Sequence, residues 1–316
     1  MKNRLLVTGG AGFIGSNFIS YMLEHTDYYI TNIDSLTYAS NRHILDEFQP
    51  NPRYTFMKGD ISKPEDIAAV TKDSYEWVIN FAAESHVDRS IEDALPFLQS
   101  NIMGTYQLLE AVRKGAISNM IQISTDEVYG SLAWSDDAFT EQTPIAPNNP
   151  YSASKASADL LVSSYVNTHQ APVIISRCSN NFGPMQNKEK FIPTIILNAM
   201  KDERIPLYGA GTNMRDWLYV EDHCRAIFNI MKNGEMGEVY NIGGNEELTN
   251  YDVLNLILKK LGKDESLIKY VDDRKGHDLR YAMNYSKVLH TLGWKPSVSF
   301  EEGIEKTIAW YTSQKR

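Results

Sequence analysis

The first half of the chain alternates short apolar runs with longer amphipathic stretches. The short runs are rich in β-branched and aromatic residues, which favour strands, and they lie at Arg4–Thr8, Tyr29–Asp34, Tyr54–Lys58, Trp77–Ala82, Asn119–Ser124 and Val173–Cys178. Helices are predicted between them, beginning near Gly12, Asn41, Lys63, Arg89 and Tyr151. Because such alternation builds β-α-β units, the order predicts an α/β fold with a doubly wound parallel sheet of the Rossmann type.

The regular alternation ends after the sixth predicted strand. Turn-forming residues then cluster in Gly183-Pro184, Ile205-Pro206 and Gly209-Ala210-Gly211. We interpret residues 1–177 as the sheet domain and residues 178–316 as a smaller C-terminal lobe. A helix at Val220–Met231 and a strand at Glu238–Ile242 are also predicted. We therefore expect a segment near 214–245 to pack with the first domain, so that the domain boundary is not a single point in the sequence.

Composition and charge narrow the class of partner. The 316 residues are 42% hydrophobic, which suits a globular protein with a sizeable core, and the formal net charge of -9 argues against a nucleic-acid partner. The two cysteines, Cys178 and Cys224, lie outside any motif for a disulfide framework or a metal site, so no metal is expected. Apolar runs are too short for a signal peptide or a bilayer span. We therefore expect no membrane partner and a cytoplasmic location.

A glycine motif directly after the first strand indicates a dinucleotide site. Thr8-Gly9-Gly10-Ala11-Gly12-Phe13-Ile14-Gly15 opens a predicted helix. Its glycines permit a tight turn, close approach of a pyrophosphate and close helix packing, and the helix N-terminus offers free N–H groups. Asp34, at the end of the second strand, is placed to bind ribose hydroxyls and would repel a 2′-phosphate, which favours NAD over NADP. A plainer interpretation makes Asp34 a helix or turn cap.

Tyr151 and Lys155 are the first candidate catalytic pair. Their spacing of four residues puts both side chains on one face of a predicted helix. A lysine ammonium beside a phenol lowers the phenol pKa and makes it usable as a base near neutrality. A solvated surface pair is the commoner origin of this spacing, but the position after the glycine motif and the strands favours catalysis here.

A hydroxyl and two carboxylates follow the fifth strand in Ser124-Thr125-Asp126-Glu127. The hydroxyls can donate to a substrate oxygen that Tyr151 deprotonates. Adjacent carboxylates can divide acid and base roles if their environments differ. The alternative is that they only cap the following turn.

Together these motifs resemble the extended short-chain dehydrogenases/reductases, and among them the dTDP-glucose 4,6-dehydratases. The Thr-Asp-Glu triplet is the specific part, since related sugar epimerases carry small residues where Asp126 and Glu127 stand. The similarity covers almost the whole chain and rests on Thr8 to Gly15, Leu36-Thr37-Tyr38-Ala39, Ala82-Ala83-Glu84-Ser85-His86-Val87-Asp88, Ser124 to Gly130, Tyr151 to Lys155, Cys178-Ser179-Asn180-Asn181 and Arg215-Asp216-Trp217-Leu218-Tyr219-Val220.

The resemblance implies conversion of dTDP-glucose to dTDP-4-keto-6-deoxyglucose and water with transient reduction of NAD, in deoxysugar biosynthesis such as that of dTDP-rhamnose. Tyr151 would remove the O4 proton, with Lys155 and Thr125 supporting that oxygen. Glu127 would take the C5 proton, and a protonated Asp126 would donate to the departing C6 oxygen. The cofactor-binding positions implied are Gly9, Gly12, Phe13, Ile14, Gly15, Asp34, Thr37, Asp60, Ile61, Ala82, Ala83, Ser85, Ser124, Tyr151 and Lys155.

The second half supplies the substrate contacts that the resemblance implies. Lysine and arginine side chains suit a diphosphate, and Pro206 to Tyr208 resembles a segment that packs against the nucleobase. The positions are Ser85, Thr125, Asn180, Lys190, Pro206, Tyr208, Arg215, Asn250 and Arg280. His86 is assigned no chemistry.

Resemblance also implies a homodimer, with helices at Arg89–Lys114 and Tyr151–His169 forming a four-helix interface, although their periodicity suits packing on the sheet equally well. Other functions stay open: a UDP- or CDP-glucose 4,6-dehydratase, a nucleotide-sugar 4-epimerase, or a non-catalytic NAD-binding regulator. The carboxylate pair disfavours the epimerase, because a base at C5 invites elimination.

Overall fold

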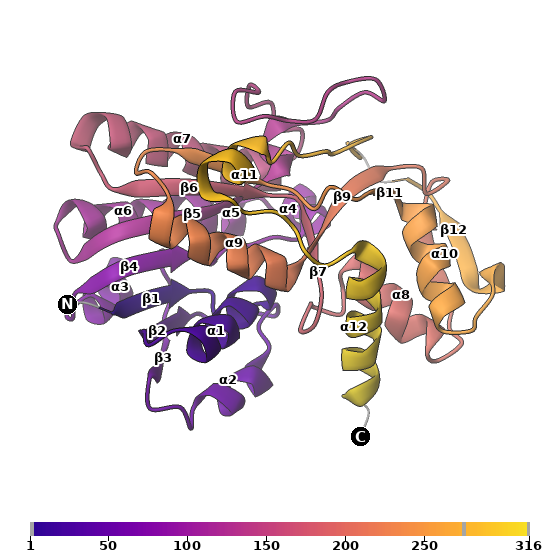
Figure 1. The fold of residues 1–316 in the computed structure, drawn as a ribbon, viewed down its shortest axis with the longest axis horizontal. Coiled ribbons are helices and arrows are strands. Elements are labelled where there is room, and N and C mark those ends of the chain that lie inside the picture. The colour runs from indigo at the N-terminus through magenta and orange to yellow at the C-terminus, as the bar shows by residue number, and fades with distance from the viewer. Residues whose placement is uncertain (1–2, 274–275, 315–316) are drawn as a thin grey trace.

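A seven-stranded parallel sheet forms the centre of the molecule in a computed structural model that describes residues 3–273 and 276–314 (Figure 1). Its order is β10-β6-β5-β4-β1-β2-β3. The strands are β1 (Arg4–Thr8), β2 (Tyr29–Asp34), β3 (Tyr54–Lys58), β4 (Tyr75–Asn80), β5 (Ile117–Thr125), β6 (Val173–Cys178) and β10 (Val239–Ile242). The order reverses between β1 and β4, and this switch point opens a crevice at the carboxyl ends of the strands.

Helices cover both faces of the sheet because the strands are apolar on both sides. Along β1, Leu5 and Val7 join one buried cluster while Leu6 joins another. The first cluster includes side chains from α1 (Phe13–His25), α2 (Arg42–Phe48), α9 (Val220–Asn233) and α11 (Ser286–Leu292). The second includes side chains from α3 (Pro64–Val70), α6 (Gly104–Arg113) and α7 (Pro150–His169). The predicted doubly wound architecture is confirmed.

The predicted helix at Arg89–Lys114 is wrong as a single element. The chain forms α4 (Val87–Glu92), a one-turn α5 (Leu95–Phe97), a π-helix at Leu98–Met103 and then α6. Helix α4 ends at Glu92, where Asp93 has extended backbone, and Pro96, which has no N–H to donate, lies in the first turn of α5. The fourth strand also lies two residues earlier than predicted and ends at Asn80.

A second lobe follows β6 and has regular structure that the turn-rich sequence did not predict. It contains a sheet of β7 (Asn180–Phe182), β9 (Met214–Tyr219) and β11 (Glu247–Thr249), and a parallel pair of β8 (Ile205–Tyr208) and β12 (Ile268–Val271). Around a third apolar cluster lie α8 (Phe191–Ala199), α10 (Asn250–Lys260) and α12 (Phe300–Ser313). Between them, α9 and β10 return to the large sheet, where β10 pairs with β6.

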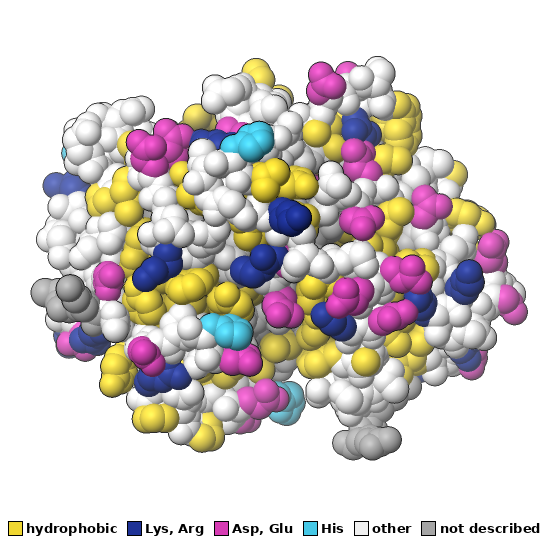
Figure 2. Space-filling model, in the orientation of Figure 1, with side chains coloured by type: hydrophobic (Ala, Val, Ile, Leu, Met, Phe, Trp, Pro, Cys, Tyr) yellow, Lys and Arg dark blue, Asp and Glu magenta, His cyan; other side chains and the backbone are white. Residues whose placement is uncertain are grey.

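The molecular surface mixes both signs of charge. On the face shown in Figure 2, lysine and arginine side chains are interspersed with aspartate and glutamate, and neither sign forms a continuous field. In the described ranges, no helix combines the length and the apolar character needed to cross a membrane.

Candidate active site

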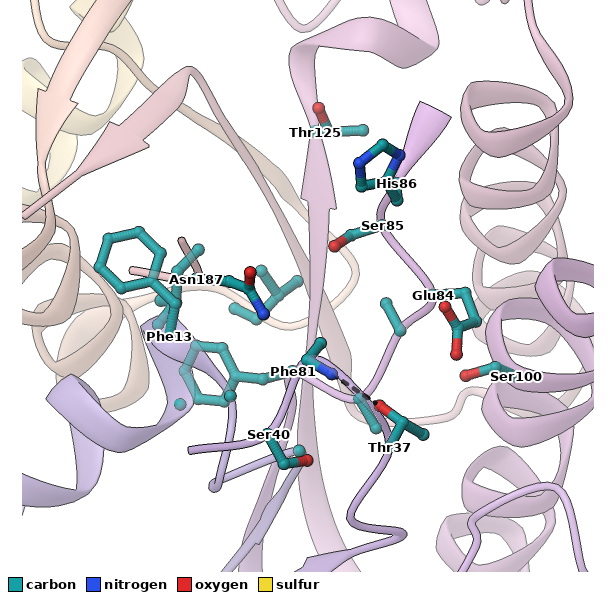
Figure 3. A pocket seen from close by; sticks show the side chains of 18 of the residues that line it. Phe13, Thr37, Ser40, Phe81, Glu84, Ser85, His86, Ser100, Thr125 and Asn187 are labelled. Atoms are coloured by element: carbon teal, nitrogen blue, oxygen red, sulfur yellow. Dashed lines mark hydrogen bonds between the residues drawn. The ribbon is translucent and has the colours of Figure 1, made fainter. Parts of the chain in front are cut away.

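Two adjoining cavities lie at the carboxyl edge of the large sheet. The first, of about 310 Å³, is lined by residues at the ends of β1, β2, β4 and β5. The second, of about 370 Å³, extends into the second lobe. Figure 3 shows Thr125 and His86 toward one end of the first cavity, Ser40 and Thr37 toward the other, and Phe13 at one side between them. Residues shared by both cavities, among them Ser85, Glu127, Asn180 and Lys190, join the two spaces.

The glycine turn between β1 and α1 has little room for side chains. A Cβ on Gly15 would lie 2.4 Å from the Gly9 carbonyl oxygen, and Gly9 itself has a φ of +68°. A Cβ on Gly12 would meet only that same oxygen, at 3.1 Å. Gly12 begins α1 without a side-chain cap, so the helix N-terminus is open to an anion. Gly15 is therefore required by packing, whereas Gly12 leaves space for a ligand.

Asp34 fits both interpretations of its role. One carboxylate oxygen accepts from the Ala11 N–H at 2.9 Å, and the other accepts from the Leu36 N–H at 2.8 Å and from the Ser40 hydroxyl at 3.0 Å. The same side chain lines the first cavity. Asp34 thus fixes the turns on both sides of the cavity floor and also offers a carboxylate to it.

Tyr151 and Lys155 lie in the first turns of α7 and are buried. Asn149 caps this helix in a capping box and Pro150 occupies its first turn. Lys155 Nζ donates to the Ile123 carbonyl at 2.6 Å. Burial lowers the pKa of Lys155, while the negative charge of Asp159 raises it.

The pKa of Tyr151 differs from the sequence prediction. Burial raises it well above its ordinary value, and the charges of Glu127 and Asp126 act in the same direction. The Lys155 ammonium donates to the Ile123 carbonyl. The predicted lowering of the phenol pKa is therefore not seen.

The two carboxylates follow β5 in a short 3-10 turn, Asp126–Tyr129. Thr125 caps this turn, accepting from the Glu127 N–H at 3.3 Å and donating to Asp126 Oδ1 at 3.0 Å. Burial and the neighbouring Glu127 raise the pKa of Asp126 well above its ordinary value. Burial also raises the pKa of Glu127, but Arg215 and Lys190 oppose that rise. Two adjacent carboxyl groups therefore occupy different environments, and burial favours the protonated form of Asp126.

Asp126 also has an unused polar atom. Its Oδ2 is buried and has no hydrogen-bond partner within the residues that the structure describes. Since buried polar atoms are nearly always paired, this oxygen is positioned to bond with a ligand in the cavity.

The structure brings nearly all predicted site residues together. The five catalytic and fifteen cofactor positions all line the first cavity. Of the predicted substrate positions, Pro206, Tyr208, Arg215 and Asn250 line the second. Arg280 is the exception and lines neither, because its guanidinium pairs with Glu247 at 2.6 Å and donates to the Asp136 carbonyl at 2.8 Å.

Comparison with known proteins agrees with this geometry. The model of the GDP-mannose 4,6 dehydratase family matches residues 6–307. The chain belongs to this dehydratase family. It is 48% identical to the low-salt glycan biosynthesis protein Agl12 of Haloferax volcanii, over 97% of this chain and 98% of that protein. It is 46% identical to dTDP-glucose 4,6-dehydratase of Neisseria gonorrhoeae, over 99% and 97%. The solved dTDP-glucose 4,6-dehydratase of Bacillus anthracis str. Ames in complex with NAD is 47% identical, with a TM-score of 0.91 over 99% and 97%.

In this dehydratase-family chain, the sequence did not single out some residues that line the site or support it. Asn101 lies in the π-helix, is buried, and clamps the loop after β4: its Oδ1 accepts from the Glu84 N–H at 2.9 Å and its Nδ2 donates to the Glu84 carbonyl at 3.1 Å. The same amide donates to Ser154 of α7 at 2.8 Å. The sequence signal that could have indicated Asn101 is a polar residue inside an otherwise helical stretch. Tyr281 and Gln186, which line the second cavity, had none.

Proposed function

We propose that this protein is a dTDP-glucose 4,6-dehydratase that uses NAD and forms dTDP-4-keto-6-deoxyglucose and water, in deoxysugar biosynthesis. The observation that carries the proposal is the pair of neighbouring carboxyl groups beside Tyr151: the buried Asp126 lines the first cavity, and the half-buried Glu127 lines both. A neutral acid next to a base is what elimination of water requires. The relatives that share this family carry the same activity in their names.

The first cavity fits NAD. Its glycine turn leaves backbone and an uncapped helix N-terminus for the pyrophosphate, and Asp34 offers a carboxylate to the ribose. We propose that the fifteen cofactor positions hold this group. When bound, NAD supplies a positively charged acceptor for hydride from C4 and later a donor of hydride to C6.

The chain's own residues move the protons. Tyr151 takes the proton of O4, while the ammonium of Lys155 and the hydroxyl of Thr125 stabilise that oxygen. Glu127 removes the C5 proton, which the neighbouring 4-ketone makes acidic. Asp126, whose burial favours the protonated form, donates its proton from the unpartnered side of its carboxyl to the departing C6 oxygen. Glu127 then returns a proton to C5.

The second cavity is proposed to hold the nucleotide. Arg215 is nearly buried, donates to the Asp278 carbonyl at 3.0 Å, and lies over the Tyr281 ring at 4.3 Å. Its fixed guanidinium suits a diphosphate, which is recognised by paired N–H donors. Ser85, Asn180 and Lys190 line both cavities and suit the sugar and phosphates between them. Arg280 would join this set only after leaving Glu247.

Domain division, assembly and location complete the proposal. We propose that residues 1–177 bind NAD, with α9 and β10 returning to that domain, and that the rest binds the nucleotide sugar. Five large apolar side chains on adjacent helices are exposed, which supports a homodimer; this helical patch consists of Ile91, Leu95, Leu98, Met103 and Leu160. Both cysteines are free and buried, which suits the reducing cytoplasm.

The test is to incubate the purified protein separately with dTDP-glucose, UDP-glucose, CDP-glucose and GDP-mannose. A 4-keto-6-deoxy product absorbs in alkali, and mass spectrometry reports the loss of one water. We expect both signals with dTDP-glucose at the highest kcat/KM. A preference for another nucleotide would replace the substrate, turnover without a change of mass would indicate an epimerase, and no turnover with any of the four would contradict the proposal.

A further inference from the structure

A buried carboxylate lies one helical turn beyond Lys155. Asp159 is fully buried, and its spacing of four residues from Lys155 puts both side chains on the same face of α7. Asp159 Oδ2 accepts from Ser124 Oγ at 2.9 Å and from Arg177 Nε at 2.8 Å. Its Oδ1 has no hydrogen-bond partner within the described chain. Burying a carboxylate costs free energy of folding unless opposite charges and hydrogen bonds compensate its charge.

The contacts of Asp159 reach the catalytic turn from two sides. Ser124 on β5 directly precedes Thr125, and it faces Arg177 of β6 in the strand register. Arg177 Nη1 donates to the Tyr129 hydroxyl at 2.8 Å, and Tyr129 ends the turn that carries both catalytic carboxyl groups. Asp159 therefore links α7 to both ends of that turn.

The charge of Asp159 also acts on Lys155. The groups facing Lys155 are Tyr151 and Asp159 on its own helix, the Ile123 carbonyl on β5 and Cys178 on β6. Asp126 and Glu127 lie on the turn beyond β5 and act on Tyr151. Of these groups, Asp159 is the foremost one that favours the charged ammonium against burial, and Cys178 adds to it.

We propose that Asp159 is a positioning residue that keeps the Lys155 side chain charged and, through Ser124 and Arg177, holds the turn bearing Asp126 and Glu127. The catalytic role of Asp159 rests on the proposed function, but its effect on the charge of Lys155 does not. A family signature of Tyr and Lys four residues apart thus extends by one more turn in this chain, to a carboxylate that never touches the reacting atoms.

The direct test uses protein labelled with ¹⁵N at the lysine Nζ atoms, without cofactor or substrate. The Lys155 signal is assigned from its loss in Lys155→Met, and its pH midpoint is measured in the wild type and in Asp159→Asn. The variant should lower the midpoint by about one pH unit or more, as expected for loss of a nearby opposite charge. An unchanged midpoint would overturn the proposal whatever the enzyme's substrate proves to be.

Two further variants serve as controls for effects of the substitution on folding. Asp159→Asn leaves Arg177 buried without its partner, which is destabilising, so Asp159→Asn/Arg177→Met removes both charges and should lower the midpoint as well. Asp222→Asn removes another buried carboxylate, paired with Arg225 at 2.5 Å and remote from Lys155 in the chain, and should leave the Lys155 midpoint where it is. A shift of the same size in Asp222→Asn would mean that general destabilisation moves the titration, and the proposal would fail.

Kinetics then show whether the charge matters for turnover. With dTDP-glucose, the alkaline limb of kcat should move to lower pH in Asp159→Asn by the same amount as the Lys155 midpoint, with KM little changed. If the midpoint moves but the limb does not, Asp159 sets the charge of Lys155 without positioning it for catalysis, and the catalytic half of the proposal is overturned.

Discussion

At the scale of single residues, neighbouring charges rather than residue type distinguish the pKa values of the two neighbouring carboxyl groups, Asp126 and Glu127. Burial raises the pKa of both groups. The negative charge of Glu127 raises the pKa of Asp126 further, whereas the positive charges of Arg215 and Lys190 lower the pKa of Glu127. A proton held on Asp126 lowers the cost of a negative Glu127 beside it. The acid and base roles proposed for these two groups thus depend on the charges around the turn.

Changing Glu127 to Gln should separate the steps of the reaction. Gln cannot take the C5 proton, so kcat for dehydration should fall by roughly 10²–10⁴-fold. Oxidation at C4 needs Tyr151 instead and should survive, so the near-ultraviolet absorbance of reduced nicotinamide should accumulate on the enzyme after substrate is added. Glu238→Gln, which alters a half-buried ion pair with Lys287, is the matched control. Turnover at the control's rate would exclude Glu127 as the C5 base.

Tyr151→Phe provides the opposite pattern. It should lose turnover to a similar extent but without any reduced nicotinamide, because the first proton cannot leave O4. Rapid-mixing absorbance on both variants distinguishes the two steps. Equal accumulation of reduced cofactor in both would contradict the division of roles.

Residue types and spacing singled out five candidate catalytic residues that line one cavity, but they did not predict the pKa of each group. Tyr151 and Lys155 share a helix, so their proximity follows from local spacing. The pKa of Tyr151 depends on burial by segments far along the chain, and the ion pair of Arg280 with Glu247 joins residues from β11 and a later loop. Such non-local contacts leave no local pattern in one sequence.

At the scale of elements, the turn between β1 and α1 contains two glycines with different tasks. In Gly15→Ala the new Cβ meets backbone at 2.4 Å, so the free energy of unfolding should fall by roughly 1–3 kcal/mol without any ligand. Gly12→Ala meets only one oxygen, at 3.1 Å, and should be nearly as stable as the wild type. It should instead lose most of the stabilisation that saturating NAD gives, which is about 2.7 kcal/mol at 100 times Kd.

Thermal and urea unfolding with and without NAD measure both effects. Gly12→Ala that kept its full response to NAD would show that the space beside Gly12 is not used by the cofactor. Gly15→Ala as stable as the wild type would show that the turn can relax around a methyl group.

The elements themselves were predicted with uneven success. β1, β2, β3 and β6 match their predicted bounds, because short runs rich in β-branched and aromatic residues favour strands. In the second lobe, α10 and α12 begin with side-chain caps at Thr249 and Ser299, followed three residues later by Asp252 and Glu302. These start signals were present in the sequence and unused. The short strands β7 and β11 have three residues each, too few for a period to appear.

At the scale of the whole molecule, the two cavities meet where the two lobes meet. Lys190 of the second lobe donates to the Ser85 carbonyl in the loop after β4 at 2.8 Å, and Arg89 pairs with Glu189 at 3.2 Å. The Arg89 guanidinium also lies 3.7 Å from the centre of the Tyr38 ring, beside the first cavity. Contacts from one lobe therefore border the ligand space of the other, which fits a reaction that needs cofactor and nucleotide sugar together.

The helical patch leads to a prediction about assembly. Leu160 on α7 is 59% exposed and Leu98 on the adjacent π-helix is 44% exposed, although both are large apolar side chains. A two-fold dimer would bury each of them and bring the two copies of α7 close together, so Leu160→Glu would place charges in an apolar interface. Light scattering at micromolar concentration should give about twice 35.9 kDa for the wild type and about 35.9 kDa for the variant.

Tyr270→Glu is the matched control, because Tyr270 is also 59% exposed but lies on β12, and this variant should remain dimeric. A monomeric wild type would contradict the dimer itself, whereas a dimeric Leu160→Glu would move the interface away from α7.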